Sequence, residues 1–323
     1  MKLVRTAAAF ALLVLAFAQG ALAQSYPSKP IRIVVPYPAG GGIDLIARAV
    51  GAQLTQRWGQ PVVVENKPGS GTIVAADGVA KSAPDGHTLL LTTDSTMTIN
   101  PHLYAKLPYD PVKDFAPVTQ LVFLNQLLLA NPAVPANNLK ELIAYAKARP
   151  GELNYGTSGL GSGGWLSVEL FSRMTVLQMT HVPYKGAGQS TAAVLGNEVH
   201  MLFTSSLAAA PYIKSGRLRA LGVTSSKRVP SMENVPALAE FIPGYEVLNF
   251  FGVLVPAGTP KPIISKLNAE INRITALPDV REQLASLGFE RVEYTPEQFT
   301  EYVKSEMKKW SAIIRKAGIK ANQ

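Results

Sequence analysis

The sequence predicts an α/β protein built from two lobes that are joined by crossing strands. Short apolar runs alternate with amphipathic helical segments, which is typical of a parallel sheet covered by helices on both faces. This alternation occurs twice, on either side of a proline-rich interval at residues 98–116. Two long apolar stretches, Val118–Ala130 and Val247–Val255, are placed to connect the two units. We therefore expect two α/β lobes rather than one.

The first unit is predicted as βαβαβ. Its apolar runs are Ile31–Val35, Val62–Val64 and Leu89–Leu91, and the helical segments between them span Ile43–Leu54 and Thr72–Lys81. We assign residues 24–122 to this first lobe. The prolines of residues 98–116 argue against long regular elements in that interval.

The second unit repeats the pattern, and we assign residues 123–246 to it. The predicted strands are Leu153–Gly156, Thr180–Tyr184, Val199–Thr204 and Leu218–Val223. The predicted helices are Asn138–Ala148, Ser162–Met174 and Ala187–Leu195. Residues 247–323 are expected to return to the first lobe through a strand and three amphipathic helices, Pro262–Ala276, Asp279–Leu287 and Pro296–Lys316.

The N-terminus has the layout of a secretory signal peptide. Lys2 and Arg5 precede the uncharged apolar stretch Ala7–Ala18, and the small-residue site Ala21–Ala23 follows. A membrane anchor is the alternative, but this stretch of about 12 residues is shorter than the roughly 20 needed to span a bilayer. We expect residues 1–23 to be removed after Ala23, which leaves 323 − 23 = 300 residues in the periplasm.

The basic charge of the chain does not indicate a nucleic-acid partner. The formal net charge is +9, and it falls to +7 when Lys2 and Arg5 leave with the leader. The remaining lysines and arginines are scattered, without a basic stripe interleaved with aromatic residues. A basic balance also suits an anionic small ligand. We expect a small-molecule ligand, no nucleic acid, and a monomer.

No motif for catalysis or metal binding occurs in the sequence. Cysteine is absent, so disulfides, thiolate nucleophiles and zinc thiolate sites are excluded. Ser158 lacks the second glycine of a G-x-S-x-G elbow, and there is no P-loop or His-Glu-x-x-His. The four histidines are dispersed. The sequence therefore predicts no enzyme, no cofactor and no metal.

Two glycine-rich loops that join a strand to a helix are the candidate anion sites. In the first, Gly40–Gly42 precede a helix, where backbone N–H groups and the helix dipole favour negative charge. We interpret Asp44 as a first-turn helix residue, since its charge would repel a carboxylate. A tight turn without a ligand is the alternative for this loop.

The second loop, Tyr155–Gly164, contains glycines at G-x-G-x-x-G spacing, the dinucleotide fingerprint. The next strand ends in Tyr184-Lys185-Gly186 instead of the acidic residue that NAD binding needs. The loop suits a smaller anion, held by N–H groups and the hydroxyls of Thr157, Ser158 and Ser162. A turn without a ligand is again the alternative.

Seven motifs in order resemble the Bug-type solute receptors of tripartite tricarboxylate transporters. The resemblance runs from about Tyr26 to the C-terminus, and its motifs are Pro36–Asp44, Glu65–Gly71, Asp85–Leu90, Asn100–Tyr104, Leu107–Pro111, Val182–Gly186 and Pro256–Pro260. The resemblance implies a periplasmic receptor of the Venus-flytrap type, which closes on a carboxylic acid and passes it to membrane permease subunits.

The resemblance also implies a set of ligand-binding residues. In the family the first loop, here Tyr37–Ile43, holds one carboxylate partly through ordered waters, and the second lobe supplies the loop Gly156–Ser162 and the segment around Tyr184. The implied contacts are Tyr37, Ala39, Gly40, Gly41, Gly42, Thr92, Thr93, Thr157, Ser158, Ser162, Tyr184, Lys185, Thr204 and Ser205.

One departure from the family pattern narrows the expected ligand. Many members carry an aspartate directly after the phenylalanine that matches Phe203, whereas this chain has Thr204. A ligand without an ammonium group is therefore expected, such as a di- or tricarboxylate or an aromatic acid.

Two other functions remain as alternatives. A receptor whose loaded form acts on a membrane sensor kinase needs the same ligand-driven closure, and the neighbouring genes would decide between the two. An exported α/β hydrolase would need a nucleophile and a base that the sequence does not supply.

Overall fold

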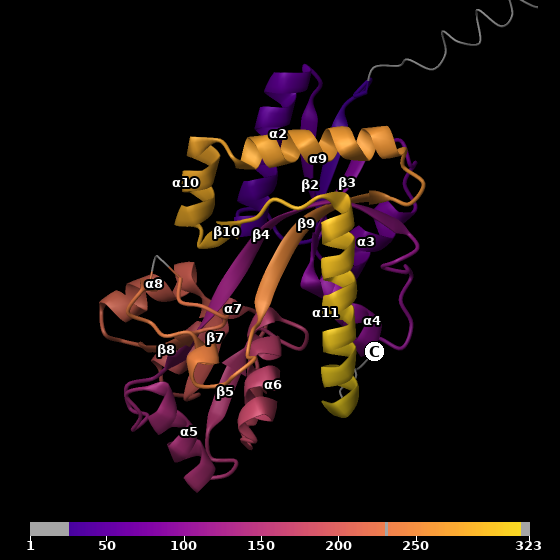
Figure 1. Cartoon of the computed structure of the whole chain (residues 1–323). Helices are drawn as coiled ribbons and strands as arrows, with labels where there is room; N and C mark the ends of the chain where they lie inside the picture. Colours follow the sequence, from indigo (N-terminus) through magenta and orange to yellow (C-terminus); the bar gives the residue numbers. More distant parts are fainter. Residues whose placement is uncertain (1–25, 230–231, 318–323) are drawn as a thin grey trace, which may run out of the picture.

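The computed structural model describes residues 26–229 and 232–317. The predicted signal peptide and its cleavage after Ala23 therefore lie outside the described residues. Figure 1 shows two α/β lobes joined by two long strands, which confirms the predicted fold class. Among the helices that are described, we find none with the length and apolar character needed to cross a bilayer.

The first lobe contains a mixed sheet in the order β2-β1-β3-β9-β4, with β10 on the far side of β4. β1 pairs in parallel with both β2 and β3, and β9 runs antiparallel to β3 and β4. The strands are β1 (Ile31–Val35), β2 (Val62–Asn66), β3 (Thr88–Thr93), β4 (Phe115–Ala130), β9 (Leu248–Pro256) and β10 (Phe289–Arg291).

The second lobe continues the sheet from β4 through β7 and β5 to β6, and β8 also pairs with β4. β5 is parallel to both β6 and β7, whereas β7 and β8 are antiparallel to β4. Its strands are β5 (Asn154–Thr157), β6 (Thr180–Pro183), β7 (Met201–Ser205) and β8 (Arg219–Val223).

β4 and β9 form the connection between the lobes. The residues of β4 from Phe115 to Asn125 pair with β9, while those from Gln126 to Ala130 pair with β7 and β8. The change of partners thus falls between Asn125 and Gln126. The predicted lobe boundaries at 122/123 and 246/247 stay predictions.

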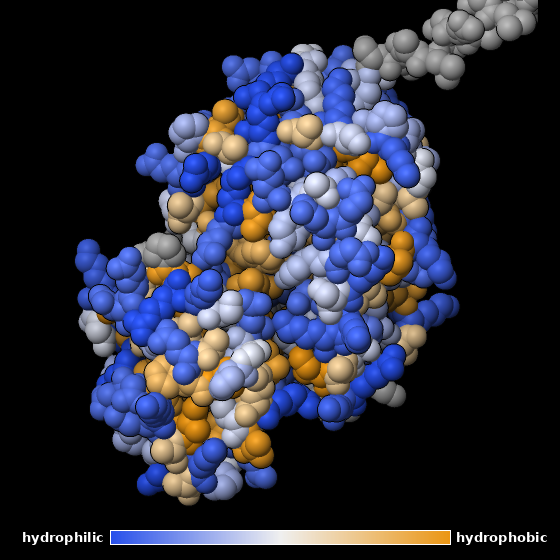
Figure 2. Space-filling view, viewed as in Figure 1, coloured by the Kyte–Doolittle hydropathy of each residue, from blue (hydrophilic) through white to orange (hydrophobic). Residues whose placement is uncertain are grey.

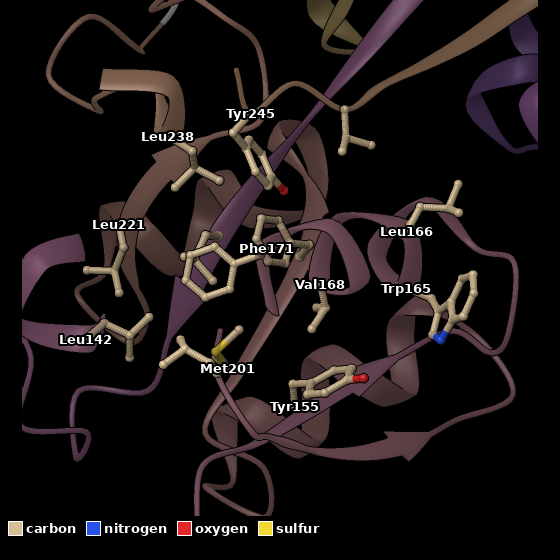
Figure 3. Close-up of a cluster of buried hydrophobic side chains, with 14 of the residues drawn as sticks. Leu142, Tyr155, Trp165, Leu166, Val168, Phe171, Met201, Leu221, Leu238 and Tyr245 are labelled. Carbon is tan, nitrogen blue, oxygen red and sulfur yellow. The ribbon is translucent and has the colours of Figure 1, made fainter. Parts of the chain in front are cut away.

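Helices cover both faces of each sheet, as the alternation of apolar runs and amphipathic helices predicts. In the first lobe, α2 (Gly42–Trp58), α9 (Lys261–Thr275) and α10 (Pro278–Ser286) share one apolar cluster with β1, and α3 (Ile73–Ala80) lies in a second cluster. In the second lobe, α5 (Leu139–Ala148) and α6 (Gly163–Thr175) cover one face, while α7 (Ala187–Leu195) and α8 (Ser206–Lys214) cover the other. Figure 3 shows the first of these second-lobe cores, with Phe171 of α6 lying near its centre.

The last helix, α11 (Pro296–Ala317), packs against both lobes. Its side chains of Phe299 and Val303 belong to an apolar cluster of the first lobe, whereas Trp310 and Ile314 are buried in the cluster of α5 and α6. Figure 1 shows this helix running alongside the connecting strands. It therefore ties the two lobes together on the side opposite α8 and α10.

The observed elements differ from the predicted ones mainly where the pattern is short or contains proline. The sequence patterns do not indicate α8, which carries Pro211 in its interior, or the three-residue strand β10. The proline-rich interval, residues 98–116, contains the short helix α4 (Asn100–Leu103), which follows the π-helix η2 (Ser95–Ile99), and the first two residues of β4. A one-turn 3-10 helix, η1 (Ser70–Thr72), precedes α3, and another, η4 (Leu238–Glu240), follows β8.

Candidate functional site

The two lobes contact each other where the parallel strands end. The Ser95 hydroxyl, just beyond β3, donates to the Gly161 carbonyl of the β5–α6 loop at 3.2 Å. Ligands of open α/β sheets bind beyond the carboxyl ends of the strands. The loops that follow β1, β3, β5 and β7 are therefore the candidate site.

The loop between β1 and α2 is held in shape by Asp44. This buried carboxylate accepts hydrogen bonds from the Gly40 N–H at 2.9 Å, from Arg48 at 2.9 Å and from Asn66 at 2.9 Å. Burial alone would raise the pKa of Asp44, but these hydrogen bonds outweigh it and lower the pKa. Asn66 also donates to the Tyr37 carbonyl at 3.0 Å. Asp44 lies in the first turn of α2, as predicted, and these hydrogen bonds show that it also organises the loop.

The start of α2 leaves several donors free. Its N-cap residue, Gly41, has no side chain to cap the helix. Among the described hydrogen bonds, none uses the N–H of Gly41, Gly42 or Ile43, whereas the Gly40 N–H is taken by Asp44. The first N–H groups of a helix need an external acceptor, and the helix dipole favours an anion there. Of the predicted loop contacts, Gly41 and Gly42 therefore offer free N–H groups, while Ala39 is exposed beside them.

Tyr37 and Thr93 come together at the end of β3, where Thr92 is the preceding residue. The Tyr37 hydroxyl lies next to the hydroxyls of Thr93 and Ser95, and burial together with the nearby Asp94 raises the pKa of Tyr37 to about 12. Thr92 and Thr93 are almost fully buried. Within the described part of the chain, neither threonine hydroxyl makes a hydrogen bond of normal geometry. Buried donors without a partner are costly, which marks this strand end as a place for a polar ligand atom or water.

In the β5–α6 loop, two of the three predicted hydroxyls are used inside the lobe. Thr157 contacts His181 Nε2 at 2.7 Å and accepts from the Gly159 N–H at 3.1 Å. Ser162 donates to the Gly159 carbonyl at 2.7 Å and caps α6 by accepting from the Trp165 N–H. Ser158, by contrast, is exposed, and its hydroxyl has no hydrogen bond among those of the described residues. Of the three hydroxyls, that of Ser158 is therefore the most available to a ligand.

Tyr184 and Lys185 follow β6, at the margin of the site. The Tyr184 ring lies against Gly156, where an added Cβ would be 3.4 Å from the ring, and it packs on the apolar cluster beneath α7. Lys185 is exposed, and its backbone N–H donates to Gln189 at 3.1 Å. None of the described hydrogen bonds connects either residue to the loops of the first lobe, so only their loop position supports a contact with the ligand.

Thr204 and Ser205 end β7. Thr204 is buried and pairs with Leu127 of β4. Ser205 is the N-cap of α8, where its hydroxyl accepts from the Ala208 N–H at 3.4 Å. The next residue, Ser206, lines a pocket of about 190 Å³ that also touches α10 and β10 of the first lobe. Figure 2 shows the surface indented between the lobes on this side.

A buried polar network at the crossing strands was not predicted from the sequence. Asn249 of β9 donates to the Asp94 carboxylate, and its carbonyl accepts from Gln126 of β4 at 2.8 Å. Gly163, at the start of α6, approaches so closely that an added Cβ would lie 2.6 Å from Gln126 Nε2. The sequence feature that could have indicated this network is the presence of polar residues inside the two apolar runs: Asn125 and Gln126 in the first run, and Asn249 in the second.

Within the described residues, no group of three or more histidine, aspartate or glutamate side chains is arranged to hold a metal ion. A larger hollow, about 580 Å³, lies on the outside of the first lobe between Pro101 and Asp114 and touches none of the loops described above. The donors at the lobe boundary are backbone N–H groups and hydroxyls, which suit an anion better than a cation.

Comparisons with known proteins identify the family. Residues 46–319 match the family described as "TctC: Tripartite tricarboxylate transporter family receptor". Protein BugT of Bordetella pertussis is 37% identical over 300 residues, which cover 92% of this chain and 92% of BugT.

Two solved structures share the fold and carry bound carboxylates. Rpa4515 of R. palustris, with adipate, has a TM-score of 0.81 and 35% identity, and the alignment covers 92% of this chain and 99% of that one. MatC (Rpa3494) from Rhodopseudomonas palustris, with bound malate, has a TM-score of 0.77 and 33% identity, with 90% and 100% coverage. The chain belongs to the tripartite tricarboxylate transporter receptor family, as its Bug-type motifs predict.

Proposed function

We propose that this protein is an exported receptor that captures a small carboxylate between its two lobes and delivers it to membrane permease subunits. The observation that carries the proposal is the set of free N–H groups at Gly41, Gly42 and Ile43, at the start of a helix that faces the lobe boundary. The family description names a transporter receptor, and the adipate and malate complexes of two relatives support a carboxylate ligand.

The chemistry of the site supports binding rather than catalysis. A helix N-terminus, the exposed Ser158 hydroxyl and the buried Thr93 hydroxyl supply hydrogen-bond donors, and none of the described hydrogen bonds pairs Ser158 with a base. The Thr157 hydroxyl, which contacts His181, is buried within the second lobe. Charge-assisted hydrogen bonds of this kind are roughly twice as strong as neutral ones. Micromolar affinity needs about 8 kcal/mol, so several of these donors have to act on one ligand.

Export is part of the proposal. The leader at residues 1–23 predicts that the mature protein in the periplasm begins at Gln24. N-terminal analysis of the periplasmic protein tests this, and an intact Met1 in the membrane fraction contradicts it.

A thermal-shift screen of small carboxylates followed by calorimetry tests the function. A ligand that binds only the folded state raises the melting temperature with its concentration. We expect at least one carboxylate to bind in the micromolar range or tighter and to be recovered chemically unchanged. Failure of every carboxylate to bind, or conversion of one into a product, overturns the proposal.

A further inference from the structure

A partly enclosed apolar pocket lies between the lobes, next to the candidate anion site. It has a volume of about 190 Å³. Leu127 and Val223 form its wall in the second lobe, and Ala285 and Phe289 form the facing wall in the first lobe. An apolar cavity of about 150 Å³ is large enough to hold benzene. The pocket therefore has room for one six-membered ring.

The pocket borders the start of α2 through one of its lining residues, Phe289. The Phe289 ring lies 3.1 Å from the position that a Cβ on Gly42 would occupy. Gly42 carries one of the free N–H groups described above. A carboxylate held by these groups can therefore place its apolar body against Phe289. Ser206, the first residue of α8, borders the same pocket from the other lobe.

Asn125, which lines this pocket, carries a buried hydrogen-bond acceptor without a partner among the described residues. The residue is 5% exposed, and its amide nitrogen donates to the Glu290 carboxylate at 2.5 Å. Because an ionised carboxylate only accepts hydrogen bonds, the amide nitrogen must face Glu290. The Asn125 carbonyl oxygen is left buried without a partner among the described residues. A ligand that donates a hydrogen bond would satisfy it.

Glu290 disfavours a second negative charge at this end. It is exposed at the pocket and forms no ion pair within the described chain. Like charges a few ångströms apart repel, most strongly where water is partly excluded. A dicarboxylate whose distal group reached the pocket would meet this charge.

We propose that the ligand is a compact aromatic monocarboxylate whose ring carries a hydrogen-bond donor such as a hydroxyl. The carboxylate binds at the start of α2, the ring fills the pocket against Phe289, and the donor reaches the Asn125 carbonyl. This inference rests on the proposed function and specifies its ligand class.

Calorimetry with benzoate, the three monohydroxybenzoates, adipate and malate tests the ligand class. We expect benzoate to bind at least tenfold more tightly than adipate and malate. We expect at least one hydroxybenzoate to bind about 2- to 12-fold more tightly than benzoate, which corresponds to one added neutral hydrogen bond.

Two tryptophan variants test the location, and a third variant tests the hydrogen-bond assignment. Ala285→Trp places a large ring in the pocket from an exposed position on α10, and it should weaken binding of benzoate at least tenfold. Ser286→Trp is the matched control, because it adds the same ring at the next residue, outside the pocket lining, and should change affinity less than twofold. Asn125→Ala should abolish the preference for the hydroxybenzoate over benzoate. Circular dichroism and melting temperature confirm that each variant folds.

The outcomes separate this inference from the proposed function. Adipate or malate binding more tightly than every aromatic acid, or equal affinities in the Ala285→Trp and Ser286→Trp variants, overturns the inference and leaves a carboxylate receptor in place. A hydroxyl preference that survives in Asn125→Ala overturns the assignment of the donor. If no carboxylate binds to the wild-type protein, the proposed function fails as well.

Discussion

The carboxylate of Asp94 accepts a hydrogen bond from the side-chain amide of Asn249, where the end of β3 meets the crossing strand β9. Asn249 in turn accepts from Gln126 of β4 at 2.8 Å, so one chain of hydrogen bonds joins the first lobe to both connecting strands. Burial raises the pKa of Asp94 from its ordinary value of 3.8 to about 6. A buried carboxylate with no cation beside it is costly when ionised.

Asp94 therefore makes folding stability depend on pH. Between about pH 4 and 6 the folded protein keeps a proton that the unfolded chain loses. The stabilisation is complete below about pH 4 and is lost as the pH rises through 6. A shift of about two pKa units corresponds to roughly 3 kcal/mol. Asp94→Asn can still accept from Asn249, so we expect it to be more stable than wild type by about 1–3 kcal/mol at pH 7.5 and equal to it near pH 4.

Urea unfolding at the two pH values measures this difference. Asp85→Asn is the control of opposite sign. Although burial opposes the effect, hydrogen bonds from Lys29 and the His87 N–H lower the pKa of Asp85, so this variant should lose stability at the higher pH. Equal pH dependence in wild type and Asp94→Asn would show that Asp94 stays ionised at little cost.

Gly41→Asp should remove carboxylate binding without unfolding the protein. Gly41 is the N-cap of α2 with φ −75°, and an added Cβ would meet nothing closer than the Pro38 carbonyl at 3.8 Å. Aspartate is a favoured N-cap residue, so it would occupy the free N–H groups and repel the ligand's carboxylate. Gly41→Ala, which adds neither charge nor cap, should keep affinity within about threefold, or roughly 0.6 kcal/mol. Near-wild-type affinity in a folded Gly41→Asp, measured by calorimetry, would place the ligand elsewhere.

Alanine substitutions at Ser158 and Ser162 should affect different properties, ligand affinity in the first case and folding stability in the second. Ser158 is exposed, whereas Ser162 caps α6. We expect Ser158→Ala to weaken binding by about 1.5–3 kcal/mol if its hydroxyl bonds to a carboxylate, and by about 0.5–1.5 kcal/mol if it bonds to a neutral atom. Ser162→Ala should cost about 0.5–2 kcal/mol of folding stability through loss of the cap. Calorimetry measures the affinity of both variants, and urea unfolding measures their stability. Loss of affinity in Ser162→Ala with unchanged affinity in Ser158→Ala would show that Ser162, not Ser158, contacts the ligand.

The sequence predicts the two-lobed fold well because its signals are local. Apolar runs such as Ile31–Val35 and the amphipathic segment of α2 are long enough to identify strand and helix without tertiary information. Elements whose stability depends on neighbours were not predicted. β10 is only three residues long and forms against β4, and α8 contains a proline.

The site is only partly predictable for the same reason. Gly-rich loops at strand ends mark where N–H groups turn outward, which singled out Gly41 and Gly42. Which hydroxyls remain free depends on partners far along the chain: Thr157 contacts His181, 24 residues away. The Asp94–Asn249 pair joins residues 155 positions apart, and no local pattern indicates such a contact.

Ligand binding should bring the lobes together. The lobes are joined by β4 and β9, and hinge closure about such connections is a common response to a ligand. α11 packs against both lobes through Phe299 and Trp310, so its position limits how far they separate.

We expect small-angle scattering to show a smaller radius of gyration at saturating ligand. Gly41→Asp at the same ligand concentration is the control and should keep the unliganded radius. An unchanged radius in wild type, with binding established by calorimetry, would mean that the lobes already hold their bound arrangement before the ligand arrives.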